Sequence, residues 1–176
     1  ARTSLFGDRE LEIARILADQ AALAIERSVL LSRSVRDPLT SLFNHGFLEK
    51  QLDQEVDRCR RHQRTCSLLL VDLDNFKQIN DTYGHDFGTR VIREMSTVIE
   101  GSLRSSDTIS RHSQDGDGRR VVARYGGDEF EILLPETPRA NALLIANRLI
   151  EKARKRVFHV AGQDVTVDLS VGVASF

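Results

Sequence analysis

The sequence has few of the residues that mark several classes of protein. Among its 176 residues are two cysteines, three prolines and no tryptophan, and its 25 basic and 26 acidic side chains nearly cancel. This balance excludes a strong overall field that would attract nucleic acid or an anionic membrane. Cys59 and Cys66 lie seven positions apart, a spacing that suits neither a zinc site nor a disulfide framework. We interpret both as packing residues in a reducing, cytoplasmic setting.

Long hydrophobic runs are also absent. No apolar stretch approaches the roughly 18 residues that indicate a membrane-spanning helix, and the first residues lack the apolar core of a signal peptide. We therefore expect the sequence to start within a longer protein. Its 40% of hydrophobic residues are enough for one domain with a real core and an added segment.

The N-terminal segment has the pattern of a long helix. Between Gly7 and Val35 there is no glycine or proline. Apolar or small residues recur there in steps of three and four, the spacing of a heptad seam, at Ala14, Leu17, Ala21, Ala24, Ser28, Leu31 and Val35. Such a helix pairs with a second copy or packs on an upstream domain; the alternative is a terminal helix that lies on its own domain. Because Pro38 disfavours helical geometry in the residue before it, we divide the chain into a signalling segment, 1–36, and a domain, 37–176.

The remaining segments alternate between helix and strand patterns. Asn44 is suited to cap a helix, and the apolar run 67–73 is typical of a strand covered on both faces. Gly126-Gly127 supplies the positive φ angles of a tight hairpin. Helices are predicted at 45–63, 75–80, 87–101 and from 137, strands at 121–125, 129–134 and between 157 and 176, with a second hairpin around 162, and an exposed loop at 111–120. Since hairpins require antiparallel pairing, the elements predict an α+β fold with a mixed sheet flanked by helices.

Acidic residues stand at the ends of two predicted strands. Alternation places Asp72 and Asp74 on one face of their strand, and Asp128 and Glu129 directly follow the two glycines. Each pair alone is weak evidence, because acidic residues at strand ends are usually just solvated. Together they provide carboxylates for Mg²⁺ beside a backbone that a triphosphate can approach, as phosphoryl transfer requires.

These residues belong to a longer pattern that resembles one family. RYGGDEF at 124–130 is the signature of GGDEF nucleotidyl cyclases, and it follows DPLT at 37–40 and DLDNFKQINDTYGH at 72–85 in the family order. SVGV at 170–173 matches a further family strand. The resemblance covers 37–176, and residues 1–36 resemble the last helix of a GAF-type sensor domain with the linker that precedes such cyclases.

The resemblance implies a fold and an activity. The fold is palm-like, with a ferredoxin-like βαββαβ core and a mainly antiparallel sheet, related to adenylyl cyclases and polymerases. The implied bacterial signalling enzyme is a homodimer in which two protomers face each other with one GTP apiece. With Mg²⁺ or Mn²⁺, each 3′ hydroxyl attacks the other α-phosphate, which gives cyclic di-GMP and pyrophosphate.

The resemblance also implies residue roles. Metal ligands would be Asp72, Asp128 and the backbone carbonyl of Leu73, and Glu129 would assist the metal or the proton transfer. Which carboxylate is the general base stays open. Phe76 and Lys77 would hold the phosphates, and Arg124 would steady charge that develops in the transition state. The substrate site would also include Asn80, which would contact the purine edge, with Asp81, Gly126 and Gly127.

One departure from the family pattern concerns the choice of base. Family members that select guanine usually carry Asp where this chain has Thr89, in GHDFGT at 84–89. A fixed carboxylate accepts hydrogen bonds from guanine and penalises adenine, whereas a hydroxyl donates or accepts. Two interpretations follow: mixed use of GTP and ATP with cyclic GMP-AMP as a product, or neutral drift with guanine still preferred.

A second departure concerns product inhibition. The family often places an Arg-x-x-Asp inhibitory motif five residues before the two glycines, but here Arg104 and Asp107 stand further upstream. The polar loop 111–120 separates them from the glycines, and an insertion explains the distance. Feedback inhibition and its loss are both compatible with this spacing.

Two other hypotheses compete with catalysis. One is a non-catalytic module that binds GTP or a cyclic dinucleotide, and the other is an interaction surface for a partner protein. The intact acidic signature argues against the first, because degenerate members generally lose these acids. Family members also continue with a helix carrying Lys and Arg toward the triphosphate, so this segment by itself is expected to have impaired turnover.

Overall fold

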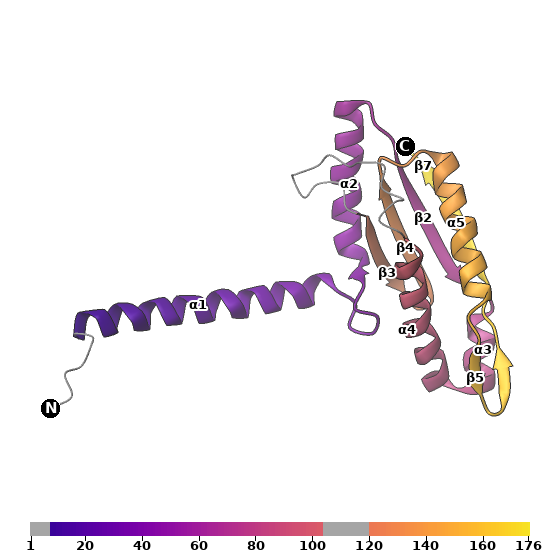
Figure 1. Cartoon of the computed structure of the whole chain (residues 1–176), viewed down its shortest axis with the longest axis horizontal. Helices are drawn as coiled ribbons and strands as arrows, with labels where there is room; N and C mark the ends of the chain where they lie inside the picture. The colour runs from indigo at the N-terminus through magenta and orange to yellow at the C-terminus, as the bar shows by residue number, and fades with distance from the viewer. Residues whose placement is uncertain (1–7, 104–119) are drawn as a thin grey trace. The chain divides into compact units, whose positions relative to one another are not determined.

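The computed structural model describes residues 8–103 and 120–176. The chain forms two compact units, Ala1–Val35 and Arg36–Phe176. Helix α1 (Asp8–Val35) lies in the first unit, as the absence of internal glycine and proline predicted (Figure 1). Among the residues that the structure describes, no helix combines the length and hydrophobicity needed to cross a membrane.

Helix α1 exposes apolar side chains along its described part. Ile13, Ile16, Leu17 and Leu23 have exposed fractions between 49% and 64%. Because they recur at three- and four-residue steps, with Leu23 further along, they lie along one broad side of the helix. This surface is apolar enough to take part in a protein contact.

A five-stranded sheet forms the centre of the second unit. Its strand order is β1-β3-β4-β2-β7, in which β1 runs parallel to β3 and the other neighbours are antiparallel. The strands are β1 (Phe43–Asn44), β2 (Cys66–Leu73), β3 (Val121–Gly126), β4 (Glu129–Pro135) and β7 (Leu169–Ser175). A separate hairpin pairs β5 (Phe158–Val160) with β6 (Gln163–Val165). The prediction of a mixed, mainly antiparallel sheet is confirmed.

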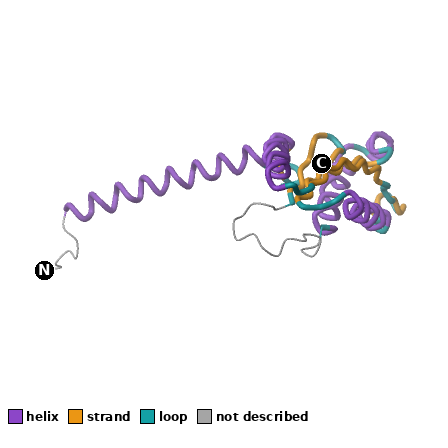
Figure 2. The backbone as a smooth tube through the Cα atoms, turned by 90° about the horizontal axis from the view of Figure 1, so that it is seen from above, coloured by secondary structure: helices purple, strands orange, loops and turns teal. Residues whose placement is uncertain are grey.

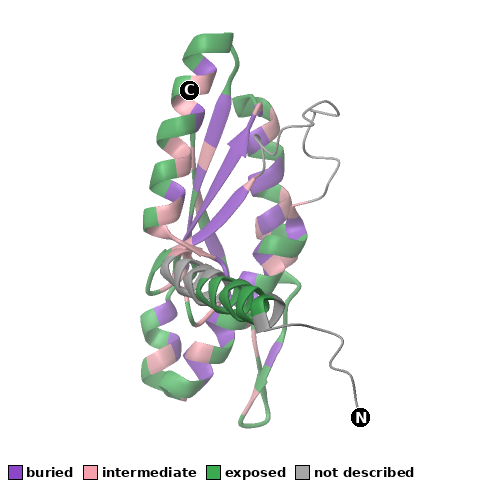
Figure 3. Ribbon diagram, turned by 90° about the vertical axis from the view of Figure 1, so that its left-hand side faces the viewer, coloured by how far each residue is buried: buried purple, intermediate pink, exposed green. Residues whose placement is uncertain are grey.

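Helices cover the two faces of the sheet unequally (Figures 1 and 2). Helices α4 (His85–Ser102) and α5 (Arg139–Arg154) pack on the inner face, where Leu69, Val71 and Ile132 are almost fully buried. Helix α2 (His45–His62) covers the outer face over β3 and β4, through a smaller cluster of Leu48, Val121, Ala123 and Leu133. The short helix α3 (Phe76–Tyr83) follows β2 and packs beside α4. Figure 3 shows the buried residues concentrated in the strands and on the inward sides of these helices.

The prediction that the apolar run 67–73 is covered on both faces is wrong for one face. Leu70, in the middle of β2, has an exposed fraction of 53%. It points to the outer face, where the described helix α2 packs over β3 and β4 instead of over β2 and β7. Apolar residues alone could not reveal this difference, because both faces of β2 carry leucine or valine.

Helix boundaries differ from the predicted ones for local reasons. Gly84, at φ 85°, separates α3 from α4, so α4 begins at His85 instead of residue 87. Helix α5 begins at Arg139 instead of Thr137, because Thr137 is buried and its hydroxyl donates to the Pro135 carbonyl at 2.9 Å. Of the predicted loop 111–120, only Arg120 lies inside the described residues.

Candidate active site

Four carboxylates gather where β2 ends and β4 begins. The register places Asp72 opposite Glu129. Burial raises the pKa of Asp72, and the negative charge of Asp128 raises it further. Glu129 and Asp74 act in the same direction. A carboxyl group that is disfavoured as an anion by its neighbours gains free energy when a cation binds beside it.

The donor set at this point suits Mg²⁺ in a nucleotide complex. Within the described residues, no three His, Cys, Asp or Glu side chains converge closely enough to hold a metal by themselves. Mg²⁺ at phosphate-transfer sites is commonly held by one or two carboxylates together with the substrate phosphates. Asp72 and Asp128, with the carbonyl of Leu73 next to Asp72 in the chain, fit this shared coordination by protein and substrate.

An open pocket extends from these carboxylates across the outer face of the sheet. Its volume is about 790 Å³, and its walls come from β2, β3, β4 and β7. Leu70 and Gly172 lie along its floor, while Asp72, Glu129 and Glu131 contribute carboxylates. The register pairs Asp72 with Glu129 and Leu70 with Glu131, so the pocket combines apolar and acidic side chains along its length.

The turn after β2 presents backbone amides beside the carboxylates. Asn75 adopts a left-handed conformation, at φ 58° and ψ 25°, and helix α3 begins at Phe76. Phe76 and Lys77 are the first two residues of α3, so their N–H groups have no acceptor within the helix. The Phe76 ring is buried, whereas Lys77 is exposed. Free amides and a cation at a helix start are suited to phosphate groups.

Helices α3 and α4 bring Asn80 against the Gly88-Thr89 step. A β carbon built on Gly88 would lie 2.0 Å from Asn80 Oδ1 and 3.1 Å from Phe76 Cζ. The side chain of Asn80 therefore occupies the space that only glycine leaves free. Thr89 is the next residue on α4, so the two predicted base-contacting residues come from adjacent parts of facing helices, and Asp81 follows Asn80 on an exposed part of α3.

No role was predicted for Gly88, although its position inside a helix pattern is a signal. Glycine inside a helix costs about 1 kcal/mol relative to alanine. Gly88 lies near the start of α4 and is buried. A glycine retained at such a cost in a helix commonly marks a close approach of another group, which here is Asn80.

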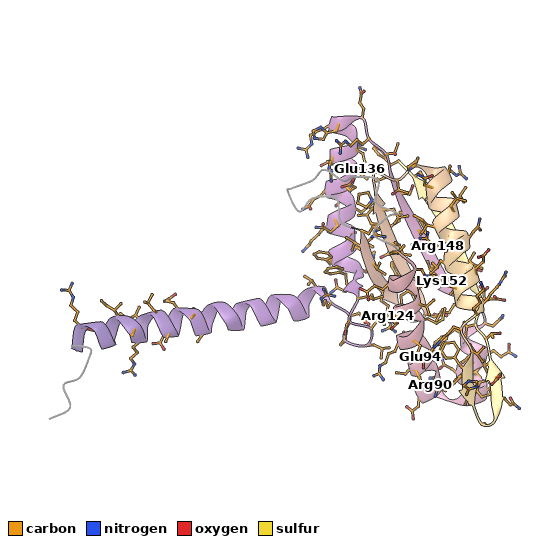
Figure 4. All side chains as sticks on the ribbon, viewed as in Figure 1. Arg90, Glu94, Arg124, Glu136, Arg148 and Lys152 are labelled. Atoms are coloured by element: carbon orange, nitrogen blue, oxygen red, sulfur yellow. The ribbon has the colours of Figure 1, made fainter. Side chains whose placement is uncertain are left out.

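Arg124 connects the glycine turn to the start of the domain (Figure 4). Its Nε and Nη2 donate to the Gly127 carbonyl at 3.0 and 2.7 Å. Its Nη1 donates to the two carboxylate oxygens of Asp37 at 3.3 and 3.1 Å. All three guanidinium nitrogens thus have protein acceptors, which favours a role in positioning the turn over direct contact with reacting phosphate.

Asp37 is itself held in a tight turn. Its Oδ1 accepts from the N–H and the hydroxyl of Thr40 at 2.8 and 2.7 Å. Burial acts to raise the pKa of Asp37, but the hydrogen bonds from Thr40 and the nearby Arg124 outweigh it, and the pKa is lowered. The DPLT sequence therefore contributes to the site through Arg124. This link was not predicted, because Asp37 and Arg124 stand 87 positions apart.

A second brace on the hairpin was also missed. His45 Nδ1 lies 2.9 Å from Glu131 Oε2, and Glu131 is only 5% exposed. The ring of Tyr125, directly before the two glycines, packs edge-on against His45 with 4.5 Å between ring centroids. The start of α2 thus contacts both strands of the hairpin that carries the acidic signature.

The His45–Glu131 contact predicts a pH-dependent contribution to stability. The hydrogen bond that His45 donates to Glu131 raises the pKa of His45 above its ordinary value of about 6.5. The contribution of His45 to the free energy of unfolding is therefore complete below that ordinary value and is lost as pH rises through the raised one. We expect His45→Gln to have a lower free energy of unfolding than wild type at about pH 5.5 and a smaller difference at about pH 9. Urea unfolding at the two pH values measures both differences.

The Glu131→Gln background is the control for this prediction. Without the Glu131 charge, the same His45→Gln replacement is expected to change stability equally at both pH values. A wild-type difference that does not depend on pH would contradict the assignment.

Two predicted residues lie outside the described part of the chain. These are Arg104 and Asp107, the candidate inhibitory pair, so their placement relative to the site stays a prediction. The other predicted residues lie at the end of β2, the start of α3, the facing turn of α4 and the β3–β4 hairpin.

The comparisons with known proteins agree with this geometry. The profile described as Diguanylate cyclase, GGDEF domain, matches residues 34–116 and 113–176. The chain belongs to the GGDEF family of diguanylate cyclases. The family resemblance inferred from the sequence is thus confirmed, and the GGDEF domain of this chain follows an N-terminal helix.

Individual relatives of this GGDEF protein are similar over most of its length. The probable diguanylate cyclase DgcC of Escherichia coli strain K12 is 37% identical over 152 residues, which are 86% of this chain and 37% of that protein. Diguanylate cyclase A of Treponema denticola is 32% identical over 174 residues, which are 97% of this chain and 43% of that protein. The GGDEF chain thus spans less than half the length of both relatives.

A solved structure shares the fold. The crystal structure of the coiled coil and GGDEF domain of DgcB from Caulobacter crescentus, in complex with c-di-GMP, gives a TM-score of 0.82 at 23% identity. The match covers 97% of this chain and 84% of that chain. The palm-like α+β architecture is thereby confirmed.

Proposed function

We propose that this chain is the catalytic part of a diguanylate cyclase, which joins two GTP molecules into cyclic di-GMP and releases pyrophosphate. The observation that carries the proposal is the gathering of Asp72, Asp128 and Glu129 where β2 ends and β4 begins, with Asp72 opposite Glu129. Burial and then these neighbouring charges raise the pKa of Asp72. The adjacent helix start and the Asn80–Gly88 contact add places for the phosphates and the base of one nucleotide.

Each residue has a defined task in this proposal. Asp72, Asp128 and the Leu73 carbonyl hold Mg²⁺ (or Mn²⁺), and Glu129 assists the metal or the proton transfer. When bound, the metal neutralises charge on the phosphates and the leaving group. The amides of Phe76 and Lys77 orient the triphosphate, and Arg124 keeps the Gly126-Gly127 turn in place.

The reaction requires two copies of the chain. The 3′ oxygen of one GTP forms a bond to the α-phosphorus of the other, the bond from that phosphorus to the β-phosphate bridge breaks, and pyrophosphate leaves. A carboxylate or water takes the hydroxyl proton, and a second, reciprocal step closes the ring. The exposed apolar side of α1 supports dimerisation through this helix, because it gives the two copies a surface to share.

Mass spectrometry of the products tests this function. The full-length protein, with the residues that continue past Phe176, is incubated with Mg²⁺ and with GTP, ATP or an equal mixture of both. Cyclic di-GMP from GTP alone is the expected product. If Mg²⁺ and GTP give no cyclic dinucleotide while GTP still binds, the non-catalytic alternative replaces this proposal.

Thr89 provides the test of base selectivity. We propose that its hydroxyl, which both donates and accepts, lets ATP enter beside GTP and gives cyclic GMP-AMP from the mixture. Thr89→Asp is then expected to shift the incorporation of guanine over adenine by about tenfold or more, because a fixed carboxylate pairs with guanine and repels the acceptor of adenine. Thr89→Ser is the matched control, since it keeps a hydroxyl. An unchanged product ratio in Thr89→Asp would exclude Thr89 as the selecting residue.

A further inference from the structure

Asp74, which is not among the predicted metal ligands, is attached to Ser170 of β7 and to Asp168, the residue before β7. Its backbone N–H donates to the Asp168 carbonyl at 3.0 Å. Its carboxylate Oδ1 accepts from the Ser170 hydroxyl at 2.6 Å. The regular pairing of β2 with β7 ends at Leu73 and Leu169, so these two bonds extend the attachment one residue beyond the strand.

The attachment lies at the connection between β2, which carries proposed metal ligands, and α3, whose first amides are proposed to bind phosphate. Leu73, whose carbonyl is the proposed metal ligand, precedes Asp74, and Asn75 follows in the left-handed conformation. Asparagine tolerates that conformation but does not require it, so contacts of the neighbouring residues help to select it. The side chain of Asn75 makes no capping bond to the helix that it begins. The bonds made by Asp74 are therefore important to the shape of this turn.

Ser170 lines the pocket beside Asp72, and its hydroxyl holds the turn that follows β2. It is opposite Asp72 in the β2–β7 register, so it shares the face that carries the carboxylates. Its hydroxyl is a neutral donor that joins Asp74 to β7. Asp168 is held in turn by Arg154, the last residue of α5, whose Nε donates to Asp168 Oδ1 at 2.7 Å.

We propose that Ser170 is a positioning residue: by holding the carboxylate of Asp74, it fixes the β2–α3 turn so that the Leu73 carbonyl and the first amides of α3 face one metal–triphosphate group. This inference rests on the proposed function and adds a residue on β7 to its site. Because the bond acts through the turn, its loss weakens the binding of the metal nucleotide more than it weakens the fold.

The test compares two serines of the same strand. Ser170→Ala removes the bond to Asp74, whereas Ser175→Ala removes the bond between Ser175 and Ser67, 2.8 Å long, which joins the same two strands at their other end. Ser170→Thr keeps the hydroxyl on a residue that suits a strand. The measurements are the KM for Mg²⁺–GTP, the Mg²⁺ concentration for half-maximal turnover, and the thermal unfolding temperature.

We expect Ser170→Ala to raise the KM by about three- to tenfold, because that is the usual effect of losing one hydrogen bond. Its unfolding temperature should match that of Ser175→Ala, whose KM should stay near wild type, and Ser170→Thr should restore most of the affinity. Equal KM values in Ser170→Ala and Ser175→Ala would overturn the proposal.

Amide hydrogen exchange separates this proposal from the proposed function. The N–H of Ile79 donates to the Asn75 carbonyl at 3.3 Å, within the first turn of α3. Its exchange should be faster in Ser170→Ala than in Ser175→Ala, even if the protein forms no cyclic dinucleotide. If wild type forms no cyclic dinucleotide but Ile79 exchanges faster in Ser170→Ala than in Ser175→Ala, the proposed enzyme is refuted and the positioning contact stands. Equal exchange rates in the two variants would refute the contact.

Discussion

Asp72→Asn is expected to lower the turnover of GTP by about a thousandfold or more, because a metal-bound carboxylate supplies several kcal/mol of transition-state stabilisation. The replacement keeps the shape of the side chain and removes its charge. Asp57→Asn is the matched control: Asp57 is 70% exposed on α2 and pairs only loosely with Arg60, at 3.8 Å. Its turnover should equal that of wild type.

The same variant should be at least as stable as wild type without metal. Burial and three neighbouring carboxylates raise the pKa of Asp72 in the folded chain. At pH values above the raised pKa, ionised Asp72 therefore lowers the free energy of unfolding. This loss disappears as the pH falls below the ordinary carboxyl value of about 3.9. At neutral pH, thermal unfolding should occur at the same or a higher temperature in Asp72→Asn.

Adding Mg²⁺ with GTP should reverse that order. The unfolding temperature of wild type should rise, because a ligand that binds only the folded state stabilises it, and that of Asp72→Asn should rise much less. A destabilised variant with normal turnover would show that Asp72 has a structural role and is no metal ligand.

Gly88→Ala is the second change with a large expected effect. The new β carbon would stand 2.0 Å from Asn80 Oδ1, so Asn80 must leave its place. Overpacking of this kind costs about 1–3 kcal/mol of stability, and a displaced substrate-positioning group costs about a hundredfold in kcat/KM. Steady-state kinetics with GTP and urea unfolding measure the two effects.

Gly101→Ala is the control on the same helix. A β carbon on Gly101 would meet no atom within 4 Å, so this replacement should leave kinetics unchanged and stabilise the protein by about 0.5–1 kcal/mol. If Gly88→Ala also behaves in this way, then Asn80 does not depend on Gly88 for its position.

The elements of the fold were predictable where local chemistry determines them. The hairpin between β3 and β4 forms at Gly126-Gly127, as predicted, but only Gly127 has a positive φ, 54°. The prediction of a positive φ at Gly126 is wrong, because Gly126 still pairs with Glu129 after an irregularity in β3. Helix α2 begins after Asn44, whose side chain accepts from the Phe47 N–H. These features depend on residues close in sequence, so the sequence contains the information directly.

The exposure of Leu70 and the distant contacts were not predictable in this way. Which side of β2 is covered depends on where α2 packs, and an apolar run is the same for both outcomes. Cys59 and Cys66, expected to be packing residues, are indeed buried and free, but their contact with each other arises only when the end of α2 meets the start of β2.

The candidate site likewise has residues that were predictable from the sequence and residues that were not. Its acidic residues and glycines were identified from a contiguous motif, but the partners that hold the motif come from elsewhere in the chain. Asp37 and Ser170 stand far from Arg124 and Asp74 in sequence, and each uses an ordinary side chain that carries no signal of its own. Such supporting contacts become visible only when the sheet is assembled.

The turn at 37–42 has a consequence for engineered sensors. The carboxylate of Asp37 accepts from Arg124, and the backbone N–H of Asp37 donates to the Leu42 carbonyl at 2.8 Å. Arg36 donates to the Ser41 carbonyl at 2.6 Å. A chimaera that fuses a foreign light- or ligand-responsive helix to this cyclase domain should therefore keep residues 36–42 with the domain. A junction placed after that turn would remove the Asp37–Arg124 bond that anchors the β3–β4 hairpin.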